Sequence, residues 1–266
     1  MTLLTGLAVP EVADGRLARR NPVCALLGVT LLTLALVVSL DVVTPLLVLG
    51  ATLLVVPWSG VPVSRLLRTG RLLLLSAVAV GVTNALFGTT RTGEELLGPI
   101  TTGSAQTGLA IALRVVAIGL PGILVVAATD PVDLADSLVQ QLRVPVKFAY
   151  GTLAALRLLP LLAEEWETQT LARRARGVDA GRNPLARLVL FAGQVLTLLV
   201  GAVRRGTRLA TAMDARGFAS GLPRTAARQQ VVRVGDVVLV LACAAVGLGA
   251  VLTSVLLGTW RPLVGG

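Results

Sequence analysis

Long apolar stretches separated by short polar segments dominate the first half of the chain. Residues 23–40 and 42–58 carry no charge and are separated only by Asp41, a pattern that predicts two membrane-spanning helices joined by a tight turn. Three more stretches of span length follow, at 72–90, 103–129 and 237–260. The pattern therefore predicts an all-α integral membrane protein with about five transmembrane helices.

The region between the fourth and fifth predicted spans has a different pattern. Asp130 before Pro131 is typical of a helix start, and leucines spaced four residues apart form an apolar stripe before Pro145, so a short amphipathic helix is predicted. Two longer helices are predicted at 146–176 and 184–216, where charges interrupt the apolar runs. We expect both to lie along or dip into the cytoplasmic face, with their apolar sides covered by lipid or a partner.

These patterns divide the chain into three predicted parts. Residues 1–129 form an N-terminal membrane bundle of four spans, residues 130–233 a cytoplasmic or interfacial module of coupling helices, and residues 234–266 a C-terminal transmembrane helix. No small-residue cleavage site follows the first apolar run, so we expect no cleaved signal peptide.

Composition excludes several classes of function. The chain is 55% apolar and 14% charged with a mean hydropathy of +0.83, whereas soluble domains carry about 25% charged residues. It contains no histidine, which excludes histidine-based metal sites and Ser-His-Asp triads. Its two cysteines, Cys24 and Cys243, match neither a disulfide framework nor a C-x-x-C pattern. Aromatic residues make up only 3%, too few for the stacking surface of a nucleic-acid-binding protein.

Positive charge is concentrated in one part of the chain. The stretch from Arg157 to Arg233 holds 13 arginines and five acidic residues, which is most of the net charge of +10. Because positive residues stay on the cytoplasmic side of membrane proteins, this stretch is expected inside the cell. The same rule predicts that the N-terminus lies inside, the loop at 91–99 outside and the C-terminus outside.

Arg114 is the one charged residue that the sequence places well inside a predicted span, in its outer half. Asp41 is expected at the outer end of the first helical hairpin. Since charges inside a membrane are normally paired, we predict a structural Asp41–Arg114 charge pair in preference to a role in transport.

Both long basic helices are predicted to end in the same tripeptide, Ala175-Arg176-Gly177 in one and Ala215-Arg216-Gly217 in the other. Gly is the preferred residue just past a helix end, and an arginine in the last turn interacts favourably with the helix dipole. The tripeptides are therefore either two ordinary helix terminations or two arginines presented for insertion into a groove of another protein. The neighbouring Arg173 and Arg205 are expected to be solvated or to face lipid headgroups.

Four segments carry a resemblance to a known family. They are Asp130-Pro131-x-Asp133-Leu134, Leu156 to Glu164, Ala172 to Gly177 and Met213 to Phe218. These segments resemble the transmembrane T component of energy-coupling factor transporters, which are prokaryotic uptake systems for vitamins and transition metals. The group includes the T proteins of cobalt, nickel and biotin transporters.

The resemblance implies a function for both tripeptides. In that family two arginines, which match Arg176 and Arg216 here, dock the T component onto two ATPase subunits, and the helices before them carry a membrane S component. The S component binds the substrate, a vitamin or a transition metal. The chain would then be a multi-pass protein of the prokaryotic cell membrane that holds no cofactor and no catalytic residue. Its only lysine, Lys147, lies outside any G-x-x-x-x-G-K-[ST] phosphate loop, so any ATPase must be a separate chain.

Two other functions remain as alternatives. Asp130, Asp133 and Asp136 are spaced as in the magnesium-diphosphate sites of membrane prenyltransferases, but such a site needs a second acidic cluster, and helix capping explains the first two aspartates. A self-contained secondary transporter would place ionisable groups at mid-membrane, where only Arg114 qualifies, and no inverted repeat is apparent.

Overall fold

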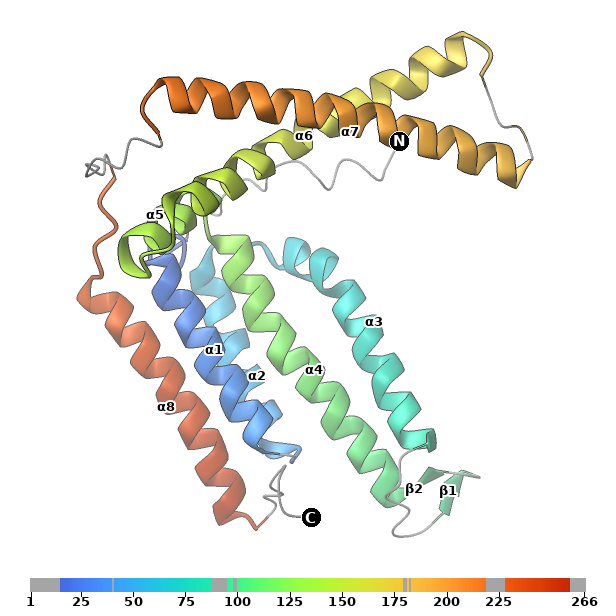
Figure 1. Ribbon diagram of the computed structural model, residues 1–266. Helices are drawn as coiled ribbons and strands as arrows, with labels where there is room; N and C mark the ends of the chain where they lie inside the picture. Colours follow the sequence, from blue (N-terminus) through green and yellow to red (C-terminus); the bar gives the residue numbers. More distant parts are fainter. Residues whose placement is uncertain are drawn as a thin grey trace. The chain divides into compact units, whose positions relative to one another are not determined.

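The computed structural model describes residues 15–39, 41–87, 95–97, 100–178, 181, 183–218 and 228–258. Within these ranges the chain is helical apart from one short pair of antiparallel strands (Figure 1). The elements are α1 (Pro22–Val38), α2 (Val43–Ser59), α3 (Val63–Phe87), β1 (Glu95–Leu97), β2 (Ile100–Thr101), α4 (Thr102–Ala128), α5 (Pro131–Gln141), α6 (Val146–Ala175), α7 (Pro184–Ala215) and α8 (Val234–Leu256). The predicted all-α architecture is confirmed.

The helices form two compact units. The bundle unit contains α1 to α5, the two strands and α8, whereas the helix-pair unit contains α6 and α7. Most helices lie where the apolar pattern predicts them, and the prediction that a short amphipathic helix follows Asp130 is confirmed by α5, whose first amide at Val132 is capped by the Asp130 carboxylate at 2.8 Å.

The start of α3 differs from the sequence prediction. The apolar pattern begins at Leu72, but the helix already begins at Val63 and includes Arg65, Arg68 and Arg71. The arginines end the apolar stretch without ending the helix, because arginine is a good helix former and its long side chain reaches the headgroup region. Hydropathy therefore marks where a helix leaves hydrocarbon, and the helix itself extends further.

Five helices are long and apolar enough to cross a membrane, namely α3, α4, α6, α7 and α8. The number agrees with the sequence prediction but the set does not, because α1 and α2 have only 17 residues each. A helix of that length spans about 25 Å, slightly less than the hydrocarbon thickness of about 30 Å. The interfacial position of α6 and α7 stays a prediction.

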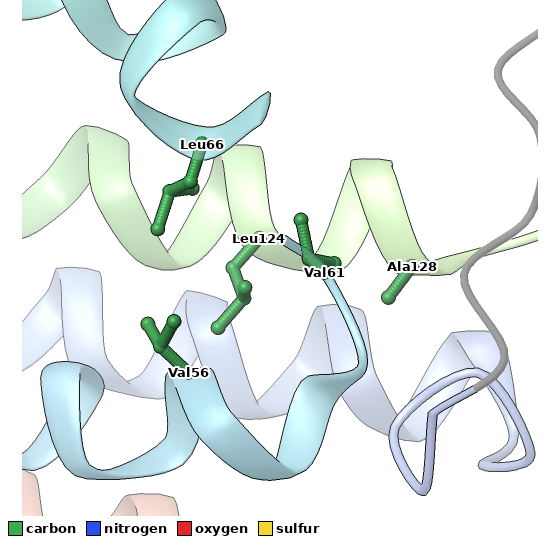
Figure 2. Packing of buried hydrophobic residues seen from close by; sticks show 5 residues of the cluster. All are labelled: Val56, Val61, Leu66, Leu124 and Ala128. Carbon is green, nitrogen blue, oxygen red and sulfur yellow. The ribbon is translucent and has the colours of Figure 1, made fainter. Parts of the chain in front are cut away.

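Two apolar clusters hold the bundle unit together. The first joins α2, the α2–α3 connection, α3 and α4 and consists of Val56, Val61, Leu66, Leu124 and Ala128 (Figure 2). The second joins α1, α2, α4 and α8 and consists of Leu32, Leu36, Val48, Ala117 and Ala250. Many leucines and valines on the outer surfaces of the same helices are exposed, as expected where lipid is the solvent.

Glycines allow α3 and α4 to approach closely. A Cβ atom added at Gly108 would lie 2.5 Å from the carbonyl oxygen of Gly81, and one added at Gly81 would lie 2.9 Å from the Cβ of Ala112. Because lipid is as apolar as a leucine side chain, helices in a membrane associate through such close backbone contacts rather than through hydrophobic burial. The Gly81–Gly108 contact therefore sets the distance between α3 and α4.

We expect Gly108→Ala to destabilise the bundle unit by about 1–3 kcal/mol, because the added methyl group forces α3 and α4 apart. The matched control is Gly122→Ala on the same helix, where an added Cβ meets no atom within 4 Å. Thermal unfolding in detergent should show a lower midpoint for the Gly108 variant only. Equal midpoints for the two variants would contradict the close-packing explanation.

Candidate docking site

The helices α6 and α7 cross near Trp166 and Gln194. The ring of Trp166 contacts that of Phe191 edge-on, with centroids 5.4 Å apart. Gln194 Nε2 donates to the Trp166 carbonyl at 3.0 Å and to Thr170 Oγ1 at 2.7 Å. The Gln194 side chain is only 7% exposed. Since a buried amide is costly without partners, these bonds favour one register of the two helices.

Two arginines connect the helices on either side of this crossing. Arg173 Nη1 donates to the Leu190 carbonyl at 2.8 Å, and Arg205 Nη2 lies 2.7 Å from Glu165 Oε2. The expectation that Arg173 and Arg205 are merely solvated or face headgroups is therefore wrong. Each has a cross-helix partner that is distant in sequence, and a side chain with such a partner contributes to the helix pair.

The two arginine tripeptides lie at opposite ends of the helix pair. Phe218, just past the end of α7, contacts Tyr150 near the start of α6, with ring centroids 6.5 Å apart, so the helices run antiparallel. The first tripeptide lies at the far end of α6, which has 30 residues and is therefore about 45 Å long. The ends of α6 and α7 that carry Arg176 and Arg216 are well separated in Figure 1.

Both tripeptides terminate their helices in the same way. At the first end, Gly177 N donates to the Arg174 carbonyl at 2.9 Å and Val178 N to the Arg173 carbonyl at 3.0 Å. The corresponding amides of Gly217 and Phe218 donate to Asp214 and Met213 at the same two distances. Gly177 and Gly217 have φ values of 71° and 77°, the left-handed conformation of a Schellman cap. Both tripeptides thus terminate their helices, as the first of the two interpretations expects.

The caps hold Arg176 and Arg216 at the C-cap position, just past the last residue of each helix. Both residues are exposed, and within the described ranges no hydrogen bond or ion pair joins their side chains to other residues. Each guanidinium is flanked by Ala on one side and Gly on the other, which leaves it sterically open. Helix termination and arginine presentation are therefore compatible properties of one motif, and docking stays a prediction.

We expect Gly217→Ala to loosen the end of α7, because the left-handed conformation costs alanine about 1–2 kcal/mol. Hydrogen exchange at the amides of residues 217 and 218 should become about tenfold faster. The control is Gly206→Ala inside α7, where added atoms meet open space and alanine favours the helix. Unchanged exchange in the Gly217 variant would show that this cap does not depend on glycine.

Asp41 and Arg114 both interact with Ser39, at the end of α1. Arg114 Nη2 donates to the Ser39 carbonyl, and Ser39 Oγ donates to Asp41 Oδ1. Asp41 Oδ2 also accepts from the amide and hydroxyl of Thr44, at 2.9 Å each, at the start of α2. Burial favours the neutral carboxyl, but the hydrogen bonds from Ser39 and Thr44 outweigh it and hold the pKa of Asp41 below its usual value. The predicted charge pair stays a prediction, with Ser39 between its members.

The three aspartates of the prenyltransferase alternative have different surroundings in the structure. Asp130 caps α5, Asp133 accepts a hydrogen bond from Gln230 at 3.1 Å, and Asp136 is 8% exposed. In the described part of the chain no group of three or more His, Cys, Asp or Glu residues is arranged to hold a metal ion. The geometry therefore gives the prenyltransferase alternative no support.

Sequence reasoning missed Gln194 and Gln230. Gln194 interrupts an otherwise apolar run, and an isolated amide at such a position is a usable signal for a buried hydrogen bond. Gln230 carries no such signal, because it follows the identical Gln229 in a polar connection. Its partners lie about 90 residues earlier in the chain, and only the fold brings them together.

A bundle of apolar helices with a charged, arginine-ended helix pair defines a multi-pass α-helical membrane protein. Comparison with known families narrows this class. The family model CbiQ, described as cobalt transport protein, matches residues 16–226. The chain belongs to this family, whose relatives are the transmembrane components of energy-coupling factor transporters.

Several relatives carry the name energy-coupling factor transporter transmembrane protein EcfT. The protein of Exiguobacterium sibiricum is 37% identical over 133 residues, 47% of this chain and 51% of that one. EcfT 1 of Listeria monocytogenes is 31% identical over 209 residues, 75% of this chain and 78% of that one. The protein of Brevibacillus brevis is 26% identical over 281 residues, 97% of this chain and 100% of that one.

The extent of these matches differs between relatives. The chain spans about half the length of the first two relatives it matches, 51% and 52%. All the names describe transporter membrane components, in agreement with the prediction that this chain is not an enzyme. They also agree with a multi-pass protein of the cell membrane.

Proposed function

We propose that this chain is the energy-coupling subunit of an uptake transporter. In this role it links two ATPase subunits to a membrane S component that binds a vitamin or a transition metal. The observation that carries the proposal is the pair of identically capped, exposed arginine ends at opposite ends of α6 and α7. Two related ends suit two related ATPase subunits, one at each end of the pair.

Arginine is well suited to such a docking point. Its guanidinium is always charged and offers five donors in a planar fork, so a groove lined by carboxylate or carbonyl oxygens binds it with directional hydrogen bonds. From a helix end, an arginine side chain can enter a groove of another protein while the helix that carries it stays outside the groove. The Schellman cap supports this arrangement, because it fixes the backbone from which the side chain projects.

The crossing of α6 and α7 supplies a means of transmitting movement. When two docked ATPase subunits approach or separate during ATP hydrolysis, the distance between Arg176 and Arg216 changes. The helices are joined by few side-chain contacts, around Trp166 and Gln194 and between Tyr150 and Phe218, and respond by changing their crossing angle. Exposed apolar residues of α7, such as Leu188 at 64% and Val189 at 70%, offer a surface that the S component or lipid covers.

This arrangement assigns a different role to each subunit. The S component binds the substrate and the ATPases bind ATP, so this chain carries neither a cofactor nor a catalytic residue. Its N-terminus and the arginine-rich region at 130–233 lie on the cytoplasmic side, and its C-terminus lies outside. Asp41 and Arg114 form a structural charge pair near the outer side of the bundle unit, with Ser39 between them.

The docking proposal is tested by co-purifying the ATPase subunits of the same transport system with arginine variants. Arg176→Ala and Arg216→Ala should each weaken binding about thirtyfold, because truncating an interface hot spot costs about 2 kcal/mol or more. The double variant should retain no ATPase while remaining inserted in the membrane. Lysine at either position should restore binding only in part, since a point charge does not reproduce the planar fork.

Arg174→Ala and Arg204→Ala are the matched controls, because both arginines are exposed and belong to the same two helices. Arg173 and Arg205 are unsuitable, since their substitution disturbs the helix pair itself. Equal loss of ATPase in all four single variants would indicate a diffuse basic surface. Undiminished co-purification with the double variant would remove the docking proposal.

Topology is tested with a cysteine at Gly181, between α6 and α7, in a Cys24→Ala and Cys243→Ala background. We expect a membrane-impermeant thiol reagent to label it only after the cells are opened, because the surrounding arginines favour the cytoplasmic side. A cysteine at Gly258, just past α8, should be labelled in intact cells. Labelling of position 181 from outside would show that α6 crosses the membrane.

A further inference from the structure

Gln230 is held by three hydrogen bonds to α5. Its side-chain Nε2 donates to Asp133 Oδ1 at 3.1 Å. Its backbone amide donates to Gln140 Oε1 at 2.9 Å, and its carbonyl accepts from Gln141 Nε2 at 3.1 Å. The backbone donor, the backbone acceptor and the side-chain amide of one residue are thus all bonded to a single helix. We call this set of contacts the Gln230 clamp.

The clamp lies where the chain leaves the bundle unit and returns to it. The helices α6 and α7 are inserted in the chain between α5 and α8, so the chain leaves the bundle unit just after α5 and returns to it at Gln230. The clamp therefore joins the point of departure to the point of return. Both covalent connections of the helix-pair unit start from one location in the bundle unit.

Further contacts tie this location to the bundle unit. Asp236, at the start of α8, is 2% exposed and accepts from Arg233 N at 2.8 Å and from Asn21 N at 3.2 Å. Asn21 caps α1, which also contacts α5. On the α5 side, Ser137 is fully buried and its hydroxyl donates to the Asp133 carbonyl at 2.6 Å. The two segments that the clamp joins, α5 and the chain leading into α8, are therefore both held within the bundle unit.

We propose that Gln230 is a positioning residue that holds the two connections together, so that displacement of α6 and α7 acts on the bundle unit at one anchored point. This inference rests on the proposed coupling function. Without the clamp, the chain at Gln230 is not bonded to α5, so the two connections can be displaced independently of each other. With it, the points where the chain leaves and re-enters the bundle unit are bonded to each other and are displaced together.

The neighbouring glutamine provides an internal comparison. Gln229 has the same side chain and is exposed, and none of the contacts of the clamp involves it. A requirement for a polar connection alone would be met equally by both residues. The bonds of Gln230 are also unlike incidental surface contacts, because two of them bind its backbone and so restrict the path of the chain.

The experiment measures the distance between two spin labels, one on each unit. Labels are attached to cysteines at Gly181 and Thr69 in the Cys24→Ala and Cys243→Ala background, in the assembled complex with the ATPase subunits. The clamp is removed by combining Gln140→Ala, Gln141→Ala and Gln230→Ala, and Gln229→Ala is the control. We expect the distance distribution to become at least twice as wide in the triple variant and to stay unchanged in the control.

Single variants test the contributions of the individual bonds. Each removes one hydrogen bond, which shifts the closed-to-open equilibrium of the clamp about three- to tenfold, so each single variant should broaden the distribution less than the triple variant. Co-purification of the ATPases should be retained throughout, because the docking arginines are unaltered. This readout separates loss of positioning from general unfolding, which would lower co-purification as well.

A second variant pair keeps the test decisive if the triple variant is unstable. Cysteines at Gln140 and Gln230, joined by a short reductant-cleavable crosslinker, should leave unchanged the distance shift produced by ADP with vanadate. A shift that disappears on crosslinking and returns with reductant would mean that the clamp opens during the cycle, and would overturn the inference.

An equally narrow distribution in the triple variant and the parent protein would also overturn it. Failure of the parent protein to bind ATPases would refute the proposed function, whereas the comparison of widths, repeated on the full chain without ATPases, would still decide whether the clamp positions the helix pair.

Discussion

In a bilayer the surrounding lipid is as apolar as the helices, so burial of leucine side chains gives little reason for one helix to prefer another. The bundle unit depends instead on close backbone approach and on polar contacts at helix ends. Gly81 and Gly108 permit such an approach between α3 and α4. Polar contacts form where helices begin or end, between Ser39 and Asp41 at one place and between the Asn21 amide and Asp236 at another. This constraint explains why exposed leucines outnumber buried ones without implying instability.

The helix-pair unit is held together differently from the bundle unit. Each of α6 and α7 has one buried residue, Ala149 and Gln194 respectively, and each of these is 7% exposed. Such a pair has little core of its own, and its cohesion comes from a few specific contacts, chiefly Trp166 with Phe191 and Glu165 with Arg205. A sparse set of contacts allows the crossing angle to change at low cost. That property is useful in a subunit proposed to transmit movement, and it is consistent with large apolar faces that partners or lipid cover.

Charged residues in this protein divide into two groups by their surroundings. Several aspartates of the bundle unit accept hydrogen bonds at helix ends or from distant residues, as Asp130, Asp133 and Asp236 do. The arginines at the two capped helix ends have no such role and remain exposed. A residue type alone therefore says little about function in this chain. The decisive feature is whether the fold already supplies the charge with a partner.

The sequence by itself determined the class of protein, the approximate extent of most helices, the cap at Asp130 and both glycine-terminated helix ends, because these depend on local hydropathy and on backbone preferences within one helical turn. It also carried the motifs of the family to which the chain belongs. Only the tertiary structure decided that Arg173 and Arg205 join two helices, that Gln194 is buried at a crossing and that Gln230, not Gln229, is fixed to α5. It likewise decided the short strand pair before α4. These features depend on partners far away in the sequence or on runs too short to have a period, and no local pattern records which residues the folded chain brings together.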